Sequence, residues 1–383
     1  MIYLDNAATT GKKPRAVINA VNYTLRELSA NPGRGGHTLS MRASETVYNA
    51  RKKVADFFGA ESEDRVIFTP SCTYSLNFAI KGCLKPNDHV IISSVEHNAV
   101  ARPIEAMRRN GVLVDVAEVI FSDPEATLRS FERLINKQTK AIVCTHASNV
   151  TGEIMPIKAL GALCRRLGII FIVDAAQTAG VLPIDCQKYG IDFLCIAPHK
   201  GLYAPMGCGI LIARAKLPFT VIEGGTGVAS AEPVQPQEFP ERLESGTLNL
   251  PAISAISAGI DFVNSKGMNN IYSSELRLIQ MLHRGLSQIR KTELYADYPK
   301  YGNFVPVLSF NLRGYNSSEL SAALNDRSIA VRGGLHCAPM IHKRLGTIER
   351  GTVRVSTGVF NSERDILYFL DVVHGLSTAK LKQ

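Results

Sequence analysis

The feature that most constrains the fold is a regular alternation of short apolar runs and helical stretches between residues 14 and 215. Several runs are continuous in Val, Ile and Leu, which is typical of strands covered on both faces of a sheet. The stretches between them show helical signals, such as Asp123 as the cap of a helix over 123–138. The alternation predicts an α/β domain with a mainly parallel sheet and helices on both faces. The predicted strands are 65–69, 89–93, 112–119, 141–146, 169–174, 192–197 and 209–213.

A second, smaller α/β region is predicted beyond residue 215. Residues 222–247 are rich in Gly, Pro, Glu and Ser and indicate a loop, and helical periodicity returns over 251–265 and 270–290. Strands are expected near 304–311 and 351–356, with a terminal helix near 362–378. We therefore predict a large domain over 14–258 and a small domain made of 1–13 and 259–383, in a chain long enough to bury a sizeable core.

Composition and charge exclude several classes of function. No basic run followed by an apolar run opens the chain, and no apolar stretch is long enough to cross a bilayer, so a soluble cytoplasmic protein without membrane contact is expected. The net charge of +9 comes from scattered residues without a basic, aromatic-rich stripe, which argues against nucleic-acid binding. The eight cysteines contain no C-x-x-C pair, so reduced thiols and no metal site are expected.

Two polar residues follow neighbouring strands of the predicted sheet, where ligands of such sheets bind. Asp174 ends the run 169–174, and a carboxylate buried there would need a positive partner such as a protonated pyridine nitrogen. A helix N-cap is an equal interpretation of Asp174. Lys200 lies in a Gly- and Pro-rich loop after the next strand, where a desolvated amine can condense with an aldehyde. The alternative for Lys200 is a surface lysine.

Two further strand ends complete the pattern. Ser71 and Thr73 lie where a strand turns into an apolar helix, which is a ready phosphate site, although an ordinary helix cap has the same sequence. His97 follows the strand 89–93, where its ring would either stack on a pyridine ring or serve the structure. The four positions together predict a site for pyridoxal 5'-phosphate.

The chain resembles the class V aminotransferase family, in particular its cysteine desulfurase and selenocysteine lyase branch. The resemblance runs nearly from end to end, through the motifs YLDNAATT, NPGRGGHTLS, SVEHNAV, HASNVTGE, VDAAQTAG, PHKGLYAPMGCG, ESGTLN, RGGLHCAP and TVRVSTGVFN. It implies the fold-type I architecture, pyridoxal 5'-phosphate as cofactor, and a homodimer with active sites at the interface.

The resemblance also implies roles for individual residues. Lys200 would be the Schiff-base lysine and proton shuttle, Asp174 the pyridinium partner and His97 the stacking residue. Gln177 would bind the phenolic oxygen of the cofactor. The phosphate would be bound by Cys72, Thr73, His199 and, from the other subunit, Thr247. The substrate would meet Asn149 and Arg354 at its carboxylate, and Arg34 and His37 at the entrance to the site.

The predicted strand that carries Arg354 supports its role physically. Alternation sets Arg354 on the same face as Thr352 and Ser356, and a guanidinium holds a carboxylate with two parallel hydrogen bonds. The alternative is an exposed arginine on an edge strand. The sequence also departs from the family pattern, because Ala197 and Pro198 stand where Ser-Gly is frequent. This removes one phosphate hydroxyl.

Cys337 separates the possible chemistries. It has Arg332 and His336 as neighbours in a segment that we expect to be a mobile loop, where a partly ionised thiol can attack a substrate sulfur. The resemblance then implies conversion of L-cysteine to L-alanine, with a persulfide on Cys337 that passes to a sulfur-acceptor protein, as in iron–sulfur cluster assembly. The alternatives are a selenocysteine lyase, an aminotransferase or β-lyase that does not use Cys337, and a non-enzymatic scaffold. In the last two of these alternatives, Cys337 would be a structural or incidental thiol.

Overall fold

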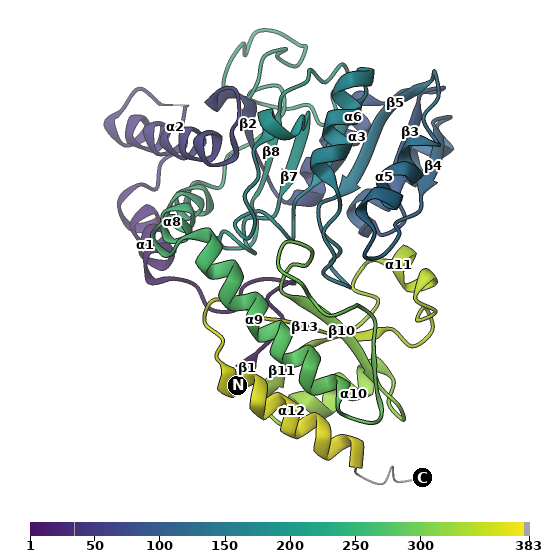
Figure 1. Cartoon of the computed structure of the whole chain (residues 1–383). Coiled ribbons are helices and arrows are strands. Elements are labelled where there is room, and N and C mark those ends of the chain that lie inside the picture. The colour runs from purple at the N-terminus through teal and green to yellow at the C-terminus, as the bar shows by residue number, and fades with distance from the viewer. Residues whose placement is uncertain (34, 379–383) are drawn as a thin grey trace.

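The large sheet of the protein contains all seven predicted strands of the first region (Figure 1). The computed structural model describes residues 1–33 and 35–378. The strand order is β2-β8-β7-β6-β5-β3-β4, and only β8 runs antiparallel to its neighbours. The predicted α/β fold with a mainly parallel sheet is therefore confirmed. The strands are β2 (Val66–Thr69), β3 (His89–Ser93), β4 (Leu113–Ala117), β5 (Thr139–Thr145), β6 (Ile170–Asp174), β7 (Phe193–Ile196) and β8 (Gly209–Ala213).

Helices cover both faces of this sheet, as the continuous apolar runs predict. Alternate residues of the strands belong to two different apolar cores; Phe171 and Val173 of β6 face one core, and Ile172 faces the other. The first core is completed by α2 (Thr38–Phe58), α5 (Pro124–Glu132), α6 (Ile157–Leu167), α7 (Cys186–Tyr189) and α8 (Leu250–Lys266). The second is completed by α3 (Cys72–Cys83) and α4 (Asn98–Arg109). The predicted cap of α5 is confirmed, since Asp123 accepts a hydrogen bond from the backbone N–H of Ala126 at 2.8 Å.

The smaller part lies below the large sheet in Figure 1 and is built on an antiparallel sheet of order β12-β13-β10-β9. Its strands are β9 (Thr292–Leu294), β10 (Val307–Leu312), β12 (Arg332–Gly334) and β13 (Thr352–Ser356). Apolar residues of α9 (Met268–Ser287), α10 (Ser317–Asn325) and α12 (Glu363–Thr378) pack with this sheet in a separate core. A short helix, α11 (Pro339–Arg344), follows β12.

The two parts are joined by α8 and α9, which follow one another from the upper left to the bottom of Figure 1. The predicted domain boundary at residue 258 falls inside α8, whose buried face packs with α1 (Arg15–Glu27) and α2. The division into domains stays a prediction. The predicted loop over 222–247 has no helix or strand. Among the residues that the structure describes, no helix has both the length and the apolar character needed to span a membrane.

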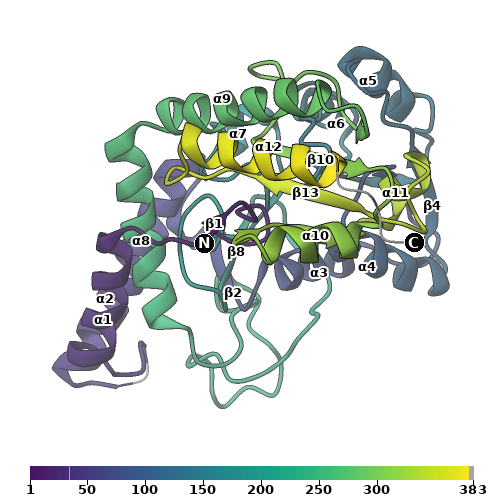
Figure 2. The same cartoon turned by 90° about the horizontal axis from the view of Figure 1, so that it is seen from below.

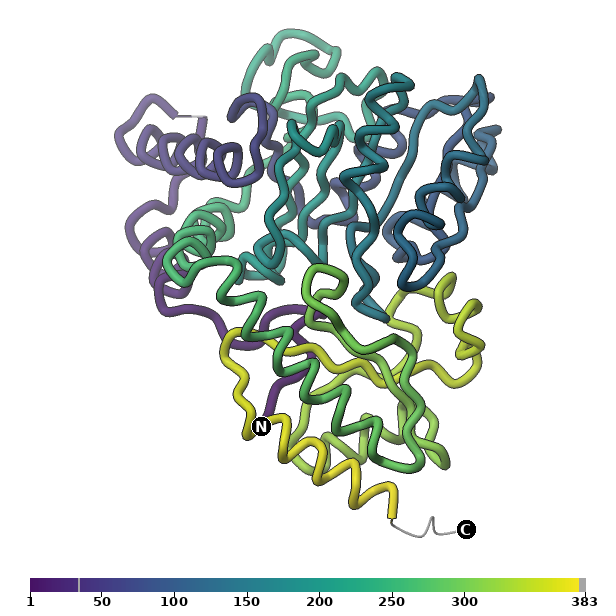
Figure 3. The backbone as a smooth tube through the Cα atoms, in the orientation of Figure 1, coloured from purple at the N-terminus to yellow at the C-terminus, as the bar shows by residue number. Residues whose placement is uncertain are grey.

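The N-terminal segment belongs to the smaller part. Strand β1 (Ile2–Tyr3) pairs in parallel with β11 (Ile329–Ala330), and Asp5 forms an isolated bridge with Ser356. Figure 3 shows this purple segment running beside the yellow-green chain before it rises to α1. It brings Ala7 and Ala8 to the wall of a cavity that is also lined by residues of the large and the small sheet.

Candidate active site

A cavity of about 210 Å³ lies at the C-terminal ends of the strands of the large sheet. Its wall contains Asp174, Lys200, His97, Thr73 and Arg354, which the sequence places in five separate motifs. The ends of β2, β3, β6 and β7 supply the first four, and β13 of the smaller part supplies the arginine. The remaining predicted residues on the wall are Cys72, Asn149, Gln177 and His199. The parallel sheet therefore concentrates the predicted chemistry at one edge, as its topology requires.

Asp174 is a buried carboxylate without a cation partner. It is only 4% exposed, and none of the ion pairs among the described residues includes it. Its Oδ1 accepts hydrogen bonds from the backbone N–H of Ala176 at 2.9 Å and from the thiol of Cys72 at 3.8 Å. Ala176 lies in a turn and not in a helix, so Asp174 is no helix N-cap. A carboxylate in this position fits a protonated ring nitrogen in the cavity.

Lys200 follows β7 by four residues and faces the same cavity. Burial is the main cause that lowers its pKa, to about 8, and the positive charge of Arg354 acts in the same direction. Asp174 opposes the shift. Within 1–33 and 35–378, no hydrogen bond or ion pair occupies the Lys200 amine. A lysine with these properties has an unusually large neutral fraction near pH 7, which makes the amine a nucleophile for an aldehyde.

The end of β2 forms an open helix N-terminus. Ser71 precedes α3, its side chain makes no capping bond, and the half-buried Cys72 and exposed Thr73 begin the helix. The loop of His199 closes this side of the cavity; burial lowers the pKa of His199 to about 4, and its buried Nδ1 has no partner in the described chain. Gly209 allows the close approach of β8, because a Cβ there would meet the Ser71 carbonyl carbon at 2.2 Å. Free N–H groups at a helix N-terminus fit a phosphate.

His97 and Gln177 stand on two further sides. His97 caps α4, with its Nδ1 accepting from the backbone N–H of Ala99 at 3.0 Å. Burial lowers the pKa of His97, and the positive charge of Lys200 lowers it further while Asp174 raises it. The ring is therefore neutral with its proton on Nε2, since Nδ1 acts as an acceptor. Gln177 donates from Nε2 to the Ala7 carbonyl at 3.2 Å. His97 thus has the structural role that we allowed for, in addition to its place on the cavity wall.

The donors in the wall fit pyridoxal 5'-phosphate. Four features of the wall match four parts of this cofactor. The Asp174 carboxylate matches the ring nitrogen, and the Lys200 amine of lowered pKa matches the aldehyde. The His97 ring matches the pyridine face, and the open N-terminus of α3 matches the phosphate. Ala197, which stands where serine is frequent in the family, lines the cavity and offers no hydroxyl to a phosphate.

Arg354 is almost completely buried and lies in an interior strand, so the alternative of an exposed edge-strand arginine is excluded. Its Nη2 donates to Asp5 Oδ1 at 2.8 Å and its Nη1 to the Asn149 carbonyl at 3.2 Å. Its buried Nε has no partner in the described chain. The ion pair between Asp5 and Arg354 was not predicted, although Asp5 lies in the first motif of the family resemblance. No periodicity links two residues 349 positions apart.

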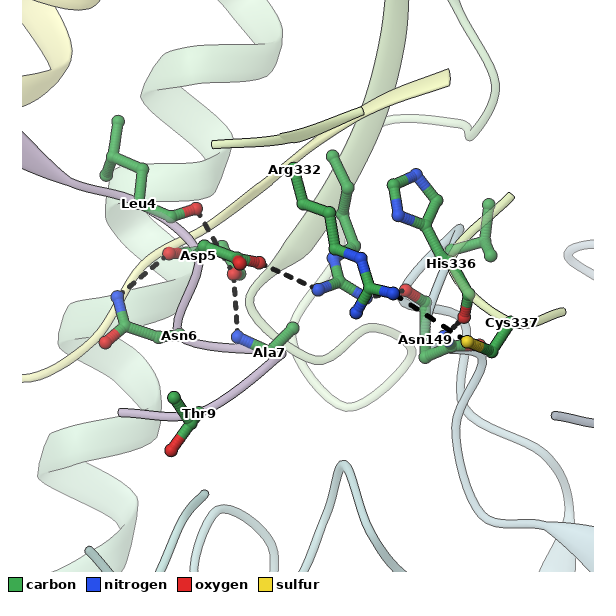
Figure 4. Close-up of polar contacts among 12 residues, drawn as sticks. Leu4, Asp5, Asn6, Ala7, Thr9, Asn149, Arg332, His336 and Cys337 are labelled. Carbon is green, nitrogen blue, oxygen red and sulfur yellow. Dashed lines mark hydrogen bonds and ion pairs between the residues drawn. The ribbon is translucent and has the colours of Figure 1, made fainter. Parts of the chain in front are cut away.

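The segment of Cys337 is bonded on both sides, which corrects the expectation of a mobile loop. The Cys337 carbonyl accepts from the backbone N–H of Asn98 at 2.7 Å, and the His336 carbonyl accepts from Asn149 Nδ2 at 2.8 Å. Gly333 is required beside it, since a Cβ there would meet the Ser317 carbonyl oxygen at 2.4 Å. Asn149 therefore holds the backbone of this segment. Figure 4 shows Asn149, His336 and Cys337 gathered beside Arg332, with Asp5, Asn6 and Ala7 on the opposite side.

The thiol of Cys337 is exposed, and among residues 1–33 and 35–378 its one cationic hydrogen-bond partner is Arg332. Arg332 Nη2 is 3.7 Å from its sulfur. His336, which we expected to flank the thiol, turns its buried ring to the carbonyl and hydroxyl of Thr352 instead. Burial lowers the pKa of His336 to about 2, so the ring carries no charge near neutral pH. Of the other seven cysteines, six are buried and Cys72 is half-buried.

Besides Cys337, which touches the cavity wall only through Arg332, three predicted residues are not placed in this cavity. Thr247 and His37 are exposed and are absent from its wall, and His37 caps α2 by accepting from the backbone N–H of Ser40 at 3.3 Å. Arg34 lies outside the described residues. The roles of all three remain predictions. Arg332 is the opposite case, because it lines the cavity although we had considered it only as a neighbour of Cys337.

Comparisons with known proteins agree with the geometry. The family model described as aminotransferase class-V matches residues 2–369. A probable cysteine desulfurase of Methanothermobacter thermautotrophicus is 32% identical, covering 95% of this chain and 92% of its own length. One of Pyrococcus abyssi is 33% identical, with 98% and 94% covered. The apo structure of a cysteine desulfurase from Thermococcus onnurineus superposes with a TM-score of 0.90 at 32% identity, covering 98% of this chain and 94% of that one. An Escherichia coli cysteine desulfurase with an S-sulfonic acid gives a TM-score of 0.85 at 26% identity, with 97% and 93% covered.

Proposed function

The chain belongs to the class-V aminotransferase family, and from this premise we propose that it is a pyridoxal-phosphate-dependent cysteine desulfurase that converts L-cysteine to L-alanine through a persulfide on Cys337. The observation that carries the residue-level proposal is one exposed thiol at 3.7 Å from Arg332, a residue that lines the same cavity as Lys200, Asp174 and Arg354. An aminotransferase or β-lyase would need the last three groups without a thiol.

The cofactor would be held by the residues described above: Lys200 at its aldehyde carbon, Asp174 at its ring nitrogen, His97 on its ring face, Gln177 at its phenolic oxygen, and Thr73, Cys72 and His199 at its phosphate. When bound, it withdraws electrons from the amino acid and so weakens the bonds at the substrate α-carbon. Arg354 would orient the substrate carboxylate through its free Nε, since Asp5 fixes the other side of the guanidinium.

Lys200 would move the substrate proton. In the holoenzyme its amine would act as a buried base beside the substrate α-carbon. Its lowered pKa of about 8 suits this role near neutral pH, because a usable fraction of the amine is unprotonated. His97 is neutral and capped, so it would position the ring and not compete for the proton.

Cys337 would then attack the sulfur of the substrate. A bond between the two sulfurs forms as the carbon–sulfur bond breaks, and the electron pair of the broken bond stays with the carbon, which becomes the methyl group of alanine after protonation. Arg332 would stabilise the negative charge of the attacking thiolate. The exposed position of Cys337 allows the persulfide to be passed to an acceptor.

We propose a cytoplasmic homodimer in which Thr247 contacts the phosphate of the partner's site, since the exposed Thr247 is absent from the wall of its own cavity. His37 and Arg34 would line the entrance to the site. A sulfur-acceptor protein would collect the persulfide, and the net charge of +9 would favour an acidic one. Iron–sulfur cluster assembly is the proposed use of the sulfur. The chain would form a large domain over 14–258 and a small domain of 1–13 and 259–383.

The test is alanine release from L-cysteine by the holoenzyme, with a reductant present, for the wild type and for Cys337→Ser. We expect release by the wild type and a loss of at least 100-fold in the variant, while deuterium exchange at the α-carbon of L-alanine continues in both. The exchange needs Lys200 and the cofactor and no thiol. Alanine release that survives in Cys337→Ser would exclude the persulfide mechanism. Release from selenocysteine alone would favour a selenocysteine lyase.

A further inference from the structure

Helix α11 packs away from the sheet that its neighbours belong to. It begins two residues after Cys337, its Ile341 belongs to a core of the large part, and Figure 2 shows it beside β4. The strand on the other side of Cys337, β12, pairs with β13 in the small sheet. The segment that carries the thiol therefore bridges the two parts of the molecule.

One side chain makes most of the polar contact between α11 and the large part. Arg344 Nη1 donates to the Ser94 hydroxyl at 3.3 Å and forms an ion pair with Glu118 at 2.5 Å. Its guanidinium carbon lies 4.3 Å from the centre of the Phe121 ring. These three partners come from the segments that follow β3 and β4 at the edge of the sheet. We call Arg344 with Ser94, Glu118 and Phe121 the α11 latch.

The latch depends on the combination of its contacts. Glu118 is 57% exposed, and an ion pair with such an exposed partner contributes little by itself. A guanidinium can hold the ring, the hydroxyl and the carboxylate at the same time, because it is planar and has several fixed donors. An arginine at the last position of a six-residue helix thus fixes the whole helix on the sheet edge.

We propose that Arg344 is a positioning residue for Cys337: by latching α11 to the large part, it holds the thiol beside Arg332, a residue of the cavity wall. The inference rests on the proposed function, since it concerns the sulfur-transfer step. That step requires the two sulfurs to meet in line, and a displacement of about 1 Å in a reacting group can lower a rate by about 100-fold. Removal of the α-proton by Lys200 does not involve Cys337, so it does not depend on the latch.

The test compares two reactions of the holoenzyme carrying Arg344→Ala. Alanine release from L-cysteine is expected to fall five- to twentyfold in kcat, with KM changed less than twofold. Deuterium exchange at the α-carbon of L-alanine is expected to stay within twofold of the wild type. Amide hydrogen exchange over residues 335–345 is expected to become faster, while exchange over β6 and β7 is unchanged.

Three further variants separate positioning from folding. Lys343→Ala removes the same charge one residue earlier from an exposed side chain that has no ion pair among the described residues, and it is expected to behave as the wild type. Glu118→Gln, at an exposed site that folding tolerates, is expected to give an intermediate loss. Arg344→Lys is expected to recover part of the activity, since lysine keeps the charge and loses the planar contacts.

Equal losses of alanine release and α-carbon exchange in Arg344→Ala and Glu118→Gln would show a general structural effect and overturn the proposal. Unchanged alanine release would overturn it as well. If the wild type releases no alanine at all, the proposed function fails, and the latch is then decided by hydrogen exchange alone. Unchanged exchange over 335–345 would reject it.

Discussion

Arg332 and Arg354 face each other across two antiparallel strands, which is an unfavourable arrangement for two cations. Arg354 is compensated by Asp5, but Arg332 has no carboxylate partner among the described residues and contacts only the sulfur of Cys337. An uncompensated arginine on a cavity wall is best explained by an anion formed during the reaction. Arg332 would therefore serve the thiolate and persulfide, and Arg354 the substrate carboxylate.

The first prediction concerns this arginine. Arg332→Gln is expected to lower kcat for alanine release by about 10- to 100-fold, because a hydrogen bond to a charged group contributes about 1.5–3 kcal/mol. Steady-state kinetics at saturating L-cysteine measures the loss. The control is Arg350→Gln, at an arginine that pairs with Glu293 outside the cavity. A rise in the KM for L-cysteine with an unchanged kcat would instead assign Arg332 to the substrate carboxylate.

The lowered pKa of Lys200 leads to a prediction for the apoenzyme. Only the unprotonated amine reacts with the cofactor aldehyde, so the rate of covalent attachment rises with pH until the amine is fully neutral. With a pKa of about 8, the rate is expected to reach half of its maximum near pH 8. Stopped-flow absorbance after mixing apoenzyme with cofactor measures it between pH 6 and 10. A midpoint above pH 10 would show that burial does not perturb the amine.

At the scale of elements, the turn from β3 to α4 depends on a buried acid. Glu96 is fully buried, accepts from the backbone N–H of Thr145 at 2.9 Å and contacts the hydroxyl of Ser93. It thereby fixes the end of β5 to the turn that precedes His97. Burial is the main cause that raises the pKa of Glu96 to about 8, and its Oε2 has no partner in the described chain.

Glu96 is expected to make stability fall with rising pH. Its folded pKa of about 8 lies above the ordinary glutamate value of 4.5, so between these values the folded state binds the proton more tightly than the unfolded state. The stabilising contribution is complete below pH 4.5 and is lost as the pH rises through 8. Glu96→Gln keeps the neutral shape and is expected to remove this part of the pH dependence. Urea unfolding at pH 5.5 and 8 measures the free energy of unfolding of both proteins. An equal change in this free energy between the two pH values for wild type and variant would contradict the prediction.

The strands and the cavity differ in how well a sequence predicts them. The seven strands of the large sheet were predictable because several are continuous apolar runs and all alternate with helical stretches. Asp174 and Lys200 were predictable because one ends such a run and the other follows the next. Strands β11 and β12 have two and three residues and no period to detect. The hydrogen bonds to the backbone of the Cys337 segment could not be predicted, because they come from Asn98 and Asn149, which are distant in sequence.

At the scale of the whole molecule, the proposed dimer makes a prediction about Thr247. Thr247→Ala is expected to weaken cofactor retention although this residue is away from the cavity of its own chain. Subunits with Thr247→Ala mixed with inactive Lys200→Ala subunits would form dimers with one intact site. At limiting cofactor, the mixture is expected to regain up to about one quarter of the wild-type alanine release, since half of randomly paired two-fold dimers are mixed. If the mixture regains no alanine release, Thr247 either serves the site of its own subunit or has no role in cofactor binding.

The bond between Asp5 and Arg354 also has a consequence for protein synthesis. Asp5 leaves the ribosome among the first residues, and Arg354 is added 349 residues later. Strand β1 likewise waits for residues 329–330 before it can pair. A nascent chain that ends before the last tenth of the sequence can form the large sheet but cannot close the pocket. A chain terminated before residue 354 is therefore expected to lack the Asp5–Arg354 bond, and its N-terminal segment can reach its final contacts only after the C-terminal region has been made.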